Sequence, residues 1–116
     1  MERYKSFFEY VKRKEPKVLY HATSNKFLPI IMKQGLKRSW DGFVYLMEKP
    51  EAFDDVVLEV NIPNKNQLID WREAWYDDND EETDMDHQYD PKNPYWIYPH
   101  DIPTKYLRVL DKNETI

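Results

Sequence analysis

The chain has 116 residues, of which 41% are hydrophobic and 34% are charged, as is typical of a single soluble domain. No apolar run approaches the roughly 18 residues of a membrane-spanning helix, and the first residues lack the apolar core of a secretory signal. Cysteine is absent, which excludes disulfides, cysteine-ligated zinc and a thiol nucleophile, and fits a cytoplasmic location.

The charge is unevenly distributed along the chain. The formal net charge is −5, from 17 basic and 22 acidic residues. Residues 77–90 hold eight carboxylates and no lysine or arginine, and the rest of the chain is slightly basic, with 17 basic against 14 acidic residues. Because the electrostatic field has an acidic and a basic region, the negative net charge does not exclude a nucleic-acid partner.

Residues 3–14 are predicted to form an amphipathic helix. Tyr4, Phe7, Phe8 and Val11 follow the i, i+3, i+4, i+7 spacing of one helix face. Pro16 ends the helix because proline cannot continue its hydrogen bonds. We expect this helix to cover one face of a sheet.

A strand, a helix and a second strand are predicted next. Residues 17–20 form the first strand, which leads into His21. The helix begins near Leu28 with Pro29 in its first turn, and Gly35 follows its end, where a positive φ costs little. A basic-aromatic turn over 37–42 precedes a strand over 43–47, and a short helical turn is predicted over 48–54, with Pro50 near its start.

The second half of the chain is mostly strands. Residues 56–62 are predicted as a strand with Val56, Leu58, Val60 and Ile62 on one side, and 67–76 as a short strand entering a helix. Residues 77–93 are expected to be a solvated acidic loop. Strands follow at 95–98 and 106–110. The predicted fold is α+β, with a mixed β-sheet split in two and helices early, in one domain over 1–116 with its core at 17–110.

His21 and Tyr45 stand out because each lies at the end of a predicted strand. A histidine there can bond ribose hydroxyls, and a tyrosine ring can stack on a flat heterocycle. The alternative is that both are ordinary core residues, since nine tyrosines are present. The three histidines are scattered, so no zinc site is expected, and with two glycines no Gly-rich phosphate loop is available.

Five segments along the chain follow one pattern in order: LYHATS at 19–24, IIMKQGL at 30–36, FVYL at 43–46, Ala52, and Ile102-Pro103 with Tyr106-Leu107. In this order they resemble the ADP-ribosyltransferase superfamily, in its diphtheria-toxin-like and poly(ADP-ribose)-polymerase-like branch. The related RNA 2′-phosphotransferases share the same core, but have histidine where this chain has Tyr45. The resemblance covers most of residues 17–110.

The resemblance implies a split sheet that binds NAD+. His21 would bond the ribose hydroxyls, and Tyr45 would stack on nicotinamide. The family prefers glycine after the histidine, and Ala22 keeps that backbone contact only with a negative φ. Arg38 lies where the family's chain borders the cofactor, although a solvated turn remains an alternative. The implied cofactor-binding residues are therefore His21, Ala22, Thr23, Tyr45 and Arg38.

The third motif of the family departs most from this chain. The family has a glutamate ahead of the last strand pair, which stabilises the positive charge that develops on the ribose. Residues 93–98 (NPYWIY) contain no carboxylate. Asp101 lies just beyond them and is the preferred substitute, with Asp90 and Glu59 as alternatives. The predicted catalytic set is therefore His21, Tyr45 and Asp101, without a metal.

The leading interpretation is an NAD+-dependent mono-ADP-ribosyltransferase, of the kind found in phage or toxin-type effectors. Its target would be a macromolecule, with a protein favoured over a nucleic acid, and no membrane partner is expected. One alternative is a degenerate member that acts by binding, for example an anti-CRISPR type inhibitor whose acidic loop imitates nucleic-acid phosphates. A third is an RNA 2′-phosphotransferase, which Tyr45 disfavours. The sequence does not indicate an oligomeric state.

Overall fold

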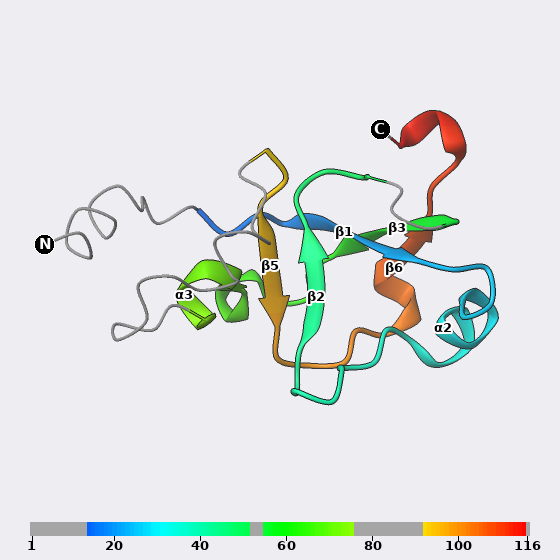
Figure 1. Ribbon diagram of the computed structural model, residues 1–116. Coiled ribbons are helices and arrows are strands. Elements are labelled where there is room, and N and C mark those ends of the chain that lie inside the picture. Colours follow the sequence, from blue (N-terminus) through cyan, green and yellow to red (C-terminus); the bar gives the residue numbers. More distant parts are fainter. Residues whose placement is uncertain (1–13, 52–54, 76–91, 116) are drawn as a thin grey trace, which may run out of the picture.

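The computed structural model describes residues 14–51, 55–75 and 92–115, which form one six-stranded sheet with two short helices (Figure 1). This confirms the α+β class. The strand order is β4-β5-β2-β1-β3-β6. The strands are β1 (Val18–Thr23), β2 (Val44–Met47), β3 (Val56–Asn61), β4 (Ile69–Asp70), β5 (Tyr95–Tyr98) and β6 (Leu107–Val109). The helices are α2 (Leu28–Gln34) and α3 (Trp71–Trp75), with 3-10 turns η1 (Lys65–Gln67), η2 (Thr104–Tyr106) and η3 (Lys112–Glu114).

The expected mixed sheet is wrong, because every neighbouring pair of these six strands is antiparallel. Parallel neighbours need a crossover that returns the chain along the whole strand. After α2 the chain instead pairs with the segment around β5. Leu36 forms an antiparallel bridge with Ile102, and Val44 pairs with Tyr98. This pairing fixes the direction of β2.

The sheet consists of two halves that meet at one point. One half contains β4, β5 and β2, and the other contains β1, β3 and β6. Within the second half, β1 pairs with β3 along its full length, from Val18↔Asn61 to Thr23↔Val56. Between the halves, β1 and β2 share the single register pair Tyr20↔Met47. In Figure 1 these two strands cross at a steep angle.

The core lies mainly on one face of the sheet. The larger apolar cluster includes Leu19, Leu46 and Trp96, and the half-buried Leu28, Ile31 and Tyr106 pack against it. Because these last three belong to α2 and η2, these two elements cover that face. A smaller cluster on the other face contains Met47, Val57 and Leu110. The alternation of side chains along each strand separates the two clusters.

The predicted boundaries of the helix that follows His21 are confirmed. α2 begins at Leu28 with Pro29 in its first turn, and Gly35 follows with φ 89° and ψ 175°. A Cβ atom on Gly35 would lie 2.6 Å from the Ile102 carbonyl oxygen. Glycine is therefore required here for its positive φ and for this close approach.

Of four other predicted segments, one is confirmed, one is partly wrong, and two lie almost wholly outside the described residues. The strand entering a helix over 67–76 is confirmed as β4 and α3. The helical turn predicted over 48–54 is wrong for residues 48–51, because the Glu48 N–H donates to the Pro94 carbonyl and the Lys49 N–H to the Asn93 side chain. Residues 52–54 lie outside the described part. Of the helix predicted over 3–14, only residue 14 belongs to the described part of the chain. Of the acidic loop predicted over 77–93, only residues 92 and 93 do, and Asn93 is buried.

Candidate functional site

His21 lies where the two halves of the sheet meet. Its Nδ1 donates a hydrogen bond to the Tyr45 carbonyl oxygen at 2.8 Å. Burial lowers the pKa of His21, and the bond to the carbonyl raises it by a smaller amount. The ring is therefore neutral near pH 7, with its proton on Nδ1 and a lone pair on Nε2. Such a ring can accept a hydrogen bond from a hydroxyl group.

The Tyr45 ring is positioned by a turn in its own chain. The Tyr45 hydroxyl donates to Asp41 Oδ2, and Asp41 Oδ1 accepts from the Phe43 N–H at 3.2 Å. In the same turn, the Gly42 N–H donates to the Ser39 carbonyl at 2.9 Å. Asp41 thus joins the turn to the ring of the strand that follows it.

The two side chains do not lie on one side of a flat sheet. Alternation places Tyr45 on the face of Met47 and His21 on the face of Leu19. The structure therefore brings the His21 ring to the main chain of Tyr45. The His21 and Tyr45 side chains could share a cleft only if the two halves of the sheet spread apart where β1 meets β2. The shared cleft therefore stays a prediction.

The predicted end of the first strand at His21 is wrong, because β1 continues through Ala22 to Thr23. Ala22 pairs with Val57 and Thr23 with Val56, and Thr23 is buried. No described residue other than glycine has a positive φ, so Ala22 meets the condition set for its backbone contact. Ser24 Oγ is buried without a hydrogen-bond partner. An orphaned hydroxyl is unfavourable by roughly 1–3 kcal/mol, so a ligand that bonded it would offset that penalty.

Arg38 and Asp101 are brought together, although they are far apart in the sequence. Asp101 Oδ1 accepts from the Arg38 N–H at 2.8 Å and from Arg38 Nε at 3.2 Å. The Lys37 ammonium lies 3.8 Å from Asp101 Oδ2. These bonds, led by the backbone N–H of Arg38, lower the pKa of Asp101. Asp101 therefore anchors the loop between α2 and β2 as an ionised carboxylate.

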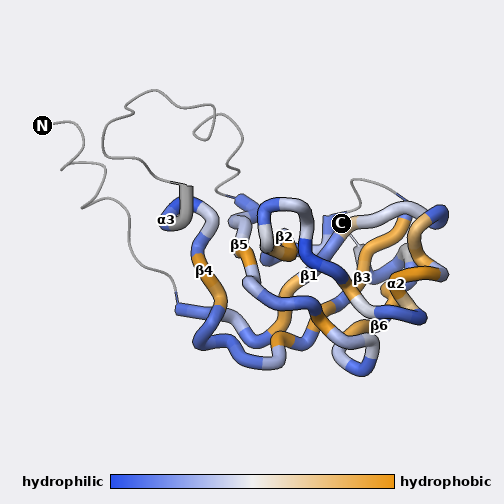
Figure 2. Tube along the Cα trace, turned by 90° about the horizontal axis from the view of Figure 1, so that it is seen from below, coloured by the Kyte–Doolittle hydropathy of each residue, from blue (hydrophilic) through white to orange (hydrophobic). Residues whose placement is uncertain are grey.

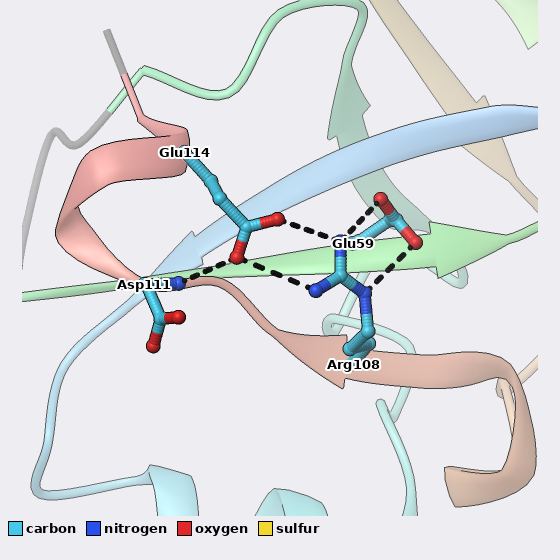
Figure 3. Close-up of polar contacts among 4 residues, drawn as sticks. All are labelled: Glu59, Arg108, Asp111 and Glu114. Carbon is cyan, nitrogen blue, oxygen red and sulfur yellow. Dashed lines mark hydrogen bonds and ion pairs between the residues drawn. The ribbon is translucent and has the colours of Figure 1, made fainter.

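Glu59, an alternative third carboxylate, is held by an arginine (Figure 3). Arg108 donates from Nε and Nη2 to the two oxygens of Glu59, at 3.2 and 3.0 Å, and from Nη1 and Nη2 to the two oxygens of Glu114. Glu114 also accepts from the Asp111 N–H. Glu59 is thus committed to a network that fixes the C-terminal turn. Asp90, the other alternative, lies outside the described residues.

Within 14–51, 55–75 and 92–115, no group of three or more histidine, aspartate or glutamate side chains is arranged to hold a metal ion. Neither of the helices in these ranges has the length and apolar character needed to cross a bilayer.

Asp41 and Ser24 were missed by the sequence reasoning as functional candidates. For Asp41 a signal was present, because an aspartate-glycine turn directly before a strand places its carboxylate near the first side chains of that strand. For Ser24, no local pattern indicates that the hydroxyl is left without a partner. Comparison of the chain with protein-family models, curated proteins and solved structures found no match.

Proposed function

We propose that this chain is an NAD+-dependent mono-ADP-ribosyltransferase with the ADP-ribosyltransferase-like fold, acting on a macromolecular target. The observation that carries the proposal is the neutral His21 at the junction of the two half-sheets, with Nδ1 bound to the Tyr45 carbonyl. That bond fixes the tautomer and the orientation of the ring, because the hydrogen bond made by one ring nitrogen decides whether the other carries a proton. Nε2 is then the acceptor for a ribose hydroxyl.

Two further features of the described residues fit NAD+. Ser24 Oγ lacks a partner and can bond a polar group of the dinucleotide. The Arg38 and Lys37 side chains are half-exposed and carry positive charge that suits a pyrophosphate. NAD+ would supply the ADP-ribose group, with loss of nicotinamide. The protein would bind and orient the ribose through His21 and contribute a carboxylate.

Two carboxylates compete for the electrostatic role in this proposal. Asp101 remains the preferred group from the sequence, and its bonds to Arg38 keep it ionised. Asp41 bonds the hydroxyl of Tyr45, a residue of the predicted catalytic set, whereas Asp101 bonds Arg38 of the predicted cofactor-binding set. Substituting each by asparagine separates the two, because only the catalytic one should lower turnover far more than NAD+ affinity.

A thermal-shift titration tests the binding step. NAD+ at millimolar concentration should raise the melting temperature by mass action on the folded state. His21→Ala should abolish the shift while circular dichroism shows an intact fold. His100→Ala is the matched control, because His100 is exposed and stacks edge-on against Tyr98, and it should retain the shift. An NAD+ shift that survives in His21→Ala would contradict the proposed site.

A second candidate is a degenerate member of the same fold that acts by binding. It is favoured by the lack of a carboxylate on β5 and by the engagement of Asp101 and Glu59 with arginines. Mass spectrometry of host proteins and nucleic acids incubated with NAD+ and the protein distinguishes the two. A gain of one ADP-ribose unit supports the transferase. Absence of both this gain and the thermal shift supports the binding protein.

A further inference from the structure

Two cation–aromatic pairs and one fully exposed tryptophan lie on three surface segments. Lys26 Nζ lies 5.7 Å from the centre of the Phe27 ring, at the start of α2. Lys105 Nζ lies 5.2 Å from the centre of the Tyr106 ring in η2, which contacts α2. Between them along the chain, the loop after α2 carries a third cation and ring two residues apart. The surface consists of Lys26, Phe27, Arg38, Trp40, Lys105 and Tyr106, and we call it the cation–aromatic surface.

Trp40 is the most exposed large apolar side chain of the described residues. Its exposed fraction is 98%, against 52% for Phe27 and 56% for Ile30 on α2. Figure 2 shows α2 at the periphery of the molecule, with apolar residues along it. The loop that carries Trp40 is itself held in place, by the Leu36↔Ile102 bridge and by the bonds from Arg38 to Asp101. A fully exposed indole on an anchored loop is a preformed flat platform.

The charge around these rings opposes that of the whole chain. Residues 24–41 contain four basic side chains and one carboxylate, Asp41, which accepts from the Tyr45 hydroxyl. Residues 99–106 add Lys105 and one carboxylate, Asp101, which is paired with Lys37 and Arg38. With Asp55, whose Oδ2 accepts from the Asn25 N–H beside Lys26, the local balance is five basic side chains against three carboxylates, although the chain carries −5 overall. A local field of this kind attracts a polyanion.

We propose that the cation–aromatic surface binds single-stranded nucleic acid. Each nucleotide presents one phosphate and one flat base, and each pair on the surface presents one cation and one ring. Bases stack on exposed aromatic rings, and lysine and arginine neutralise the phosphates. A duplex hides the faces of its bases, and an acidic peptide offers charge without flat rings. The surface shares Arg38 with the proposed NAD+ site, but the binding of a single strand requires no cofactor and is tested without NAD+.

Fluorescence anisotropy of the full chain tests this proposal, with a labelled single strand of about 12 nucleotides, within the usual range of site sizes. Trp40→Ala should weaken binding roughly tenfold, as expected for the loss of one stacked base. Trp40→Phe should retain most of the affinity, because it keeps a ring. Circular dichroism of both variants should match the wild type, since Trp40 makes little contact with the fold.

Salt dependence provides an independent readout. The pair Lys26→Gln with Lys105→Gln should lower the slope of log affinity against log salt by about 1.4, at roughly 0.7 for each phosphate contact of a single strand. The matched control is Lys17→Gln with Lys65→Gln, which removes two exposed charges outside the surface and should leave the slope unchanged. No binding by the wild type at low salt, or an equal loss in the control pair, would overturn the proposal. So would equal or tighter binding to a duplex, to phosphatidylserine vesicles or to polyglutamate.

Discussion

Replacing Gly35 by alanine should strongly destabilise the fold, for two reasons that can be separated. At φ 89° and ψ 175° the backbone occupies a region essentially restricted to glycine, so strain alone costs about 1–3 kcal/mol. The new Cβ would also lie 2.6 Å from the Ile102 carbonyl oxygen. Leu36 and Ile102 exchange two hydrogen bonds of 2.8 Å, and displacing them loses about 1 kcal/mol each. The expected loss is about 3–5 kcal/mol.

Gly42→Ala is the matched control for the strain component. Gly42 has φ 91°, but no atom would lie within 4 Å of an added Cβ. Its expected loss is about 1–2 kcal/mol, the penalty of a left-handed conformation alone. Urea unfolding followed by tryptophan fluorescence gives both free energies, provided the m-values agree. If Gly35→Ala were no more destabilising than Gly42→Ala, the close approach to Ile102 would not limit the sequence there.

Three further predictions concern titrating and charged groups. Because burial lowers the pKa of His21 below its ordinary 6.5, the unfolded chain binds that proton more readily, and the free energy of unfolding should fall as pH drops below about 6.5. In His21→Asn, the free energy of unfolding, measured by urea titration at a series of pH values, should depend less on pH in this range. If the chain is a transferase, Asp101→Asn should keep NAD+ binding and lower transfer by about a hundredfold, measured by mass spectrometry, and an equal loss of both would make Asp101 a structural anchor. Arg108→Gln should leave the melting temperature nearly unchanged, because the network is exposed, but should speed hydrogen exchange in the C-terminal turn that Glu114 holds.

Local signals in the sequence were sufficient for most individual elements. Pro29 and Gly35 delimit α2 because one cannot donate a backbone hydrogen bond and the other tolerates a positive φ. Prolines on both sides of residues 95–98 confine β5 to that stretch. Such effects act within a few residues, so the sequence alone shows them.

The pairing of those elements depends on contacts between distant residues, which single-sequence patterns do not show. The antiparallel direction of β2 follows from the bridge between Leu36 and Ile102, which are far apart in the chain. The anchoring of Arg38 by Asp101 spans a separation of 63 residues. His21 was singled out because it was predicted to end a strand, but it lies within β1, and its bond to the carbonyl of Tyr45 involves a backbone group that every residue has.

The division of the sheet also bears on how the chain can fold. Each half takes strands from both ends of the chain, since β1, β3 and β6 alternate along the sequence with β2, β4 and β5. Neither half can therefore assemble until nearly the whole chain is available, and so many non-local pairings favour slow folding, on the scale of milliseconds to seconds. A cut between β4 and β5 would leave two fragments that each hold strands of both halves. Neither fragment could complete even one half by itself, so the two would fold only by recombining.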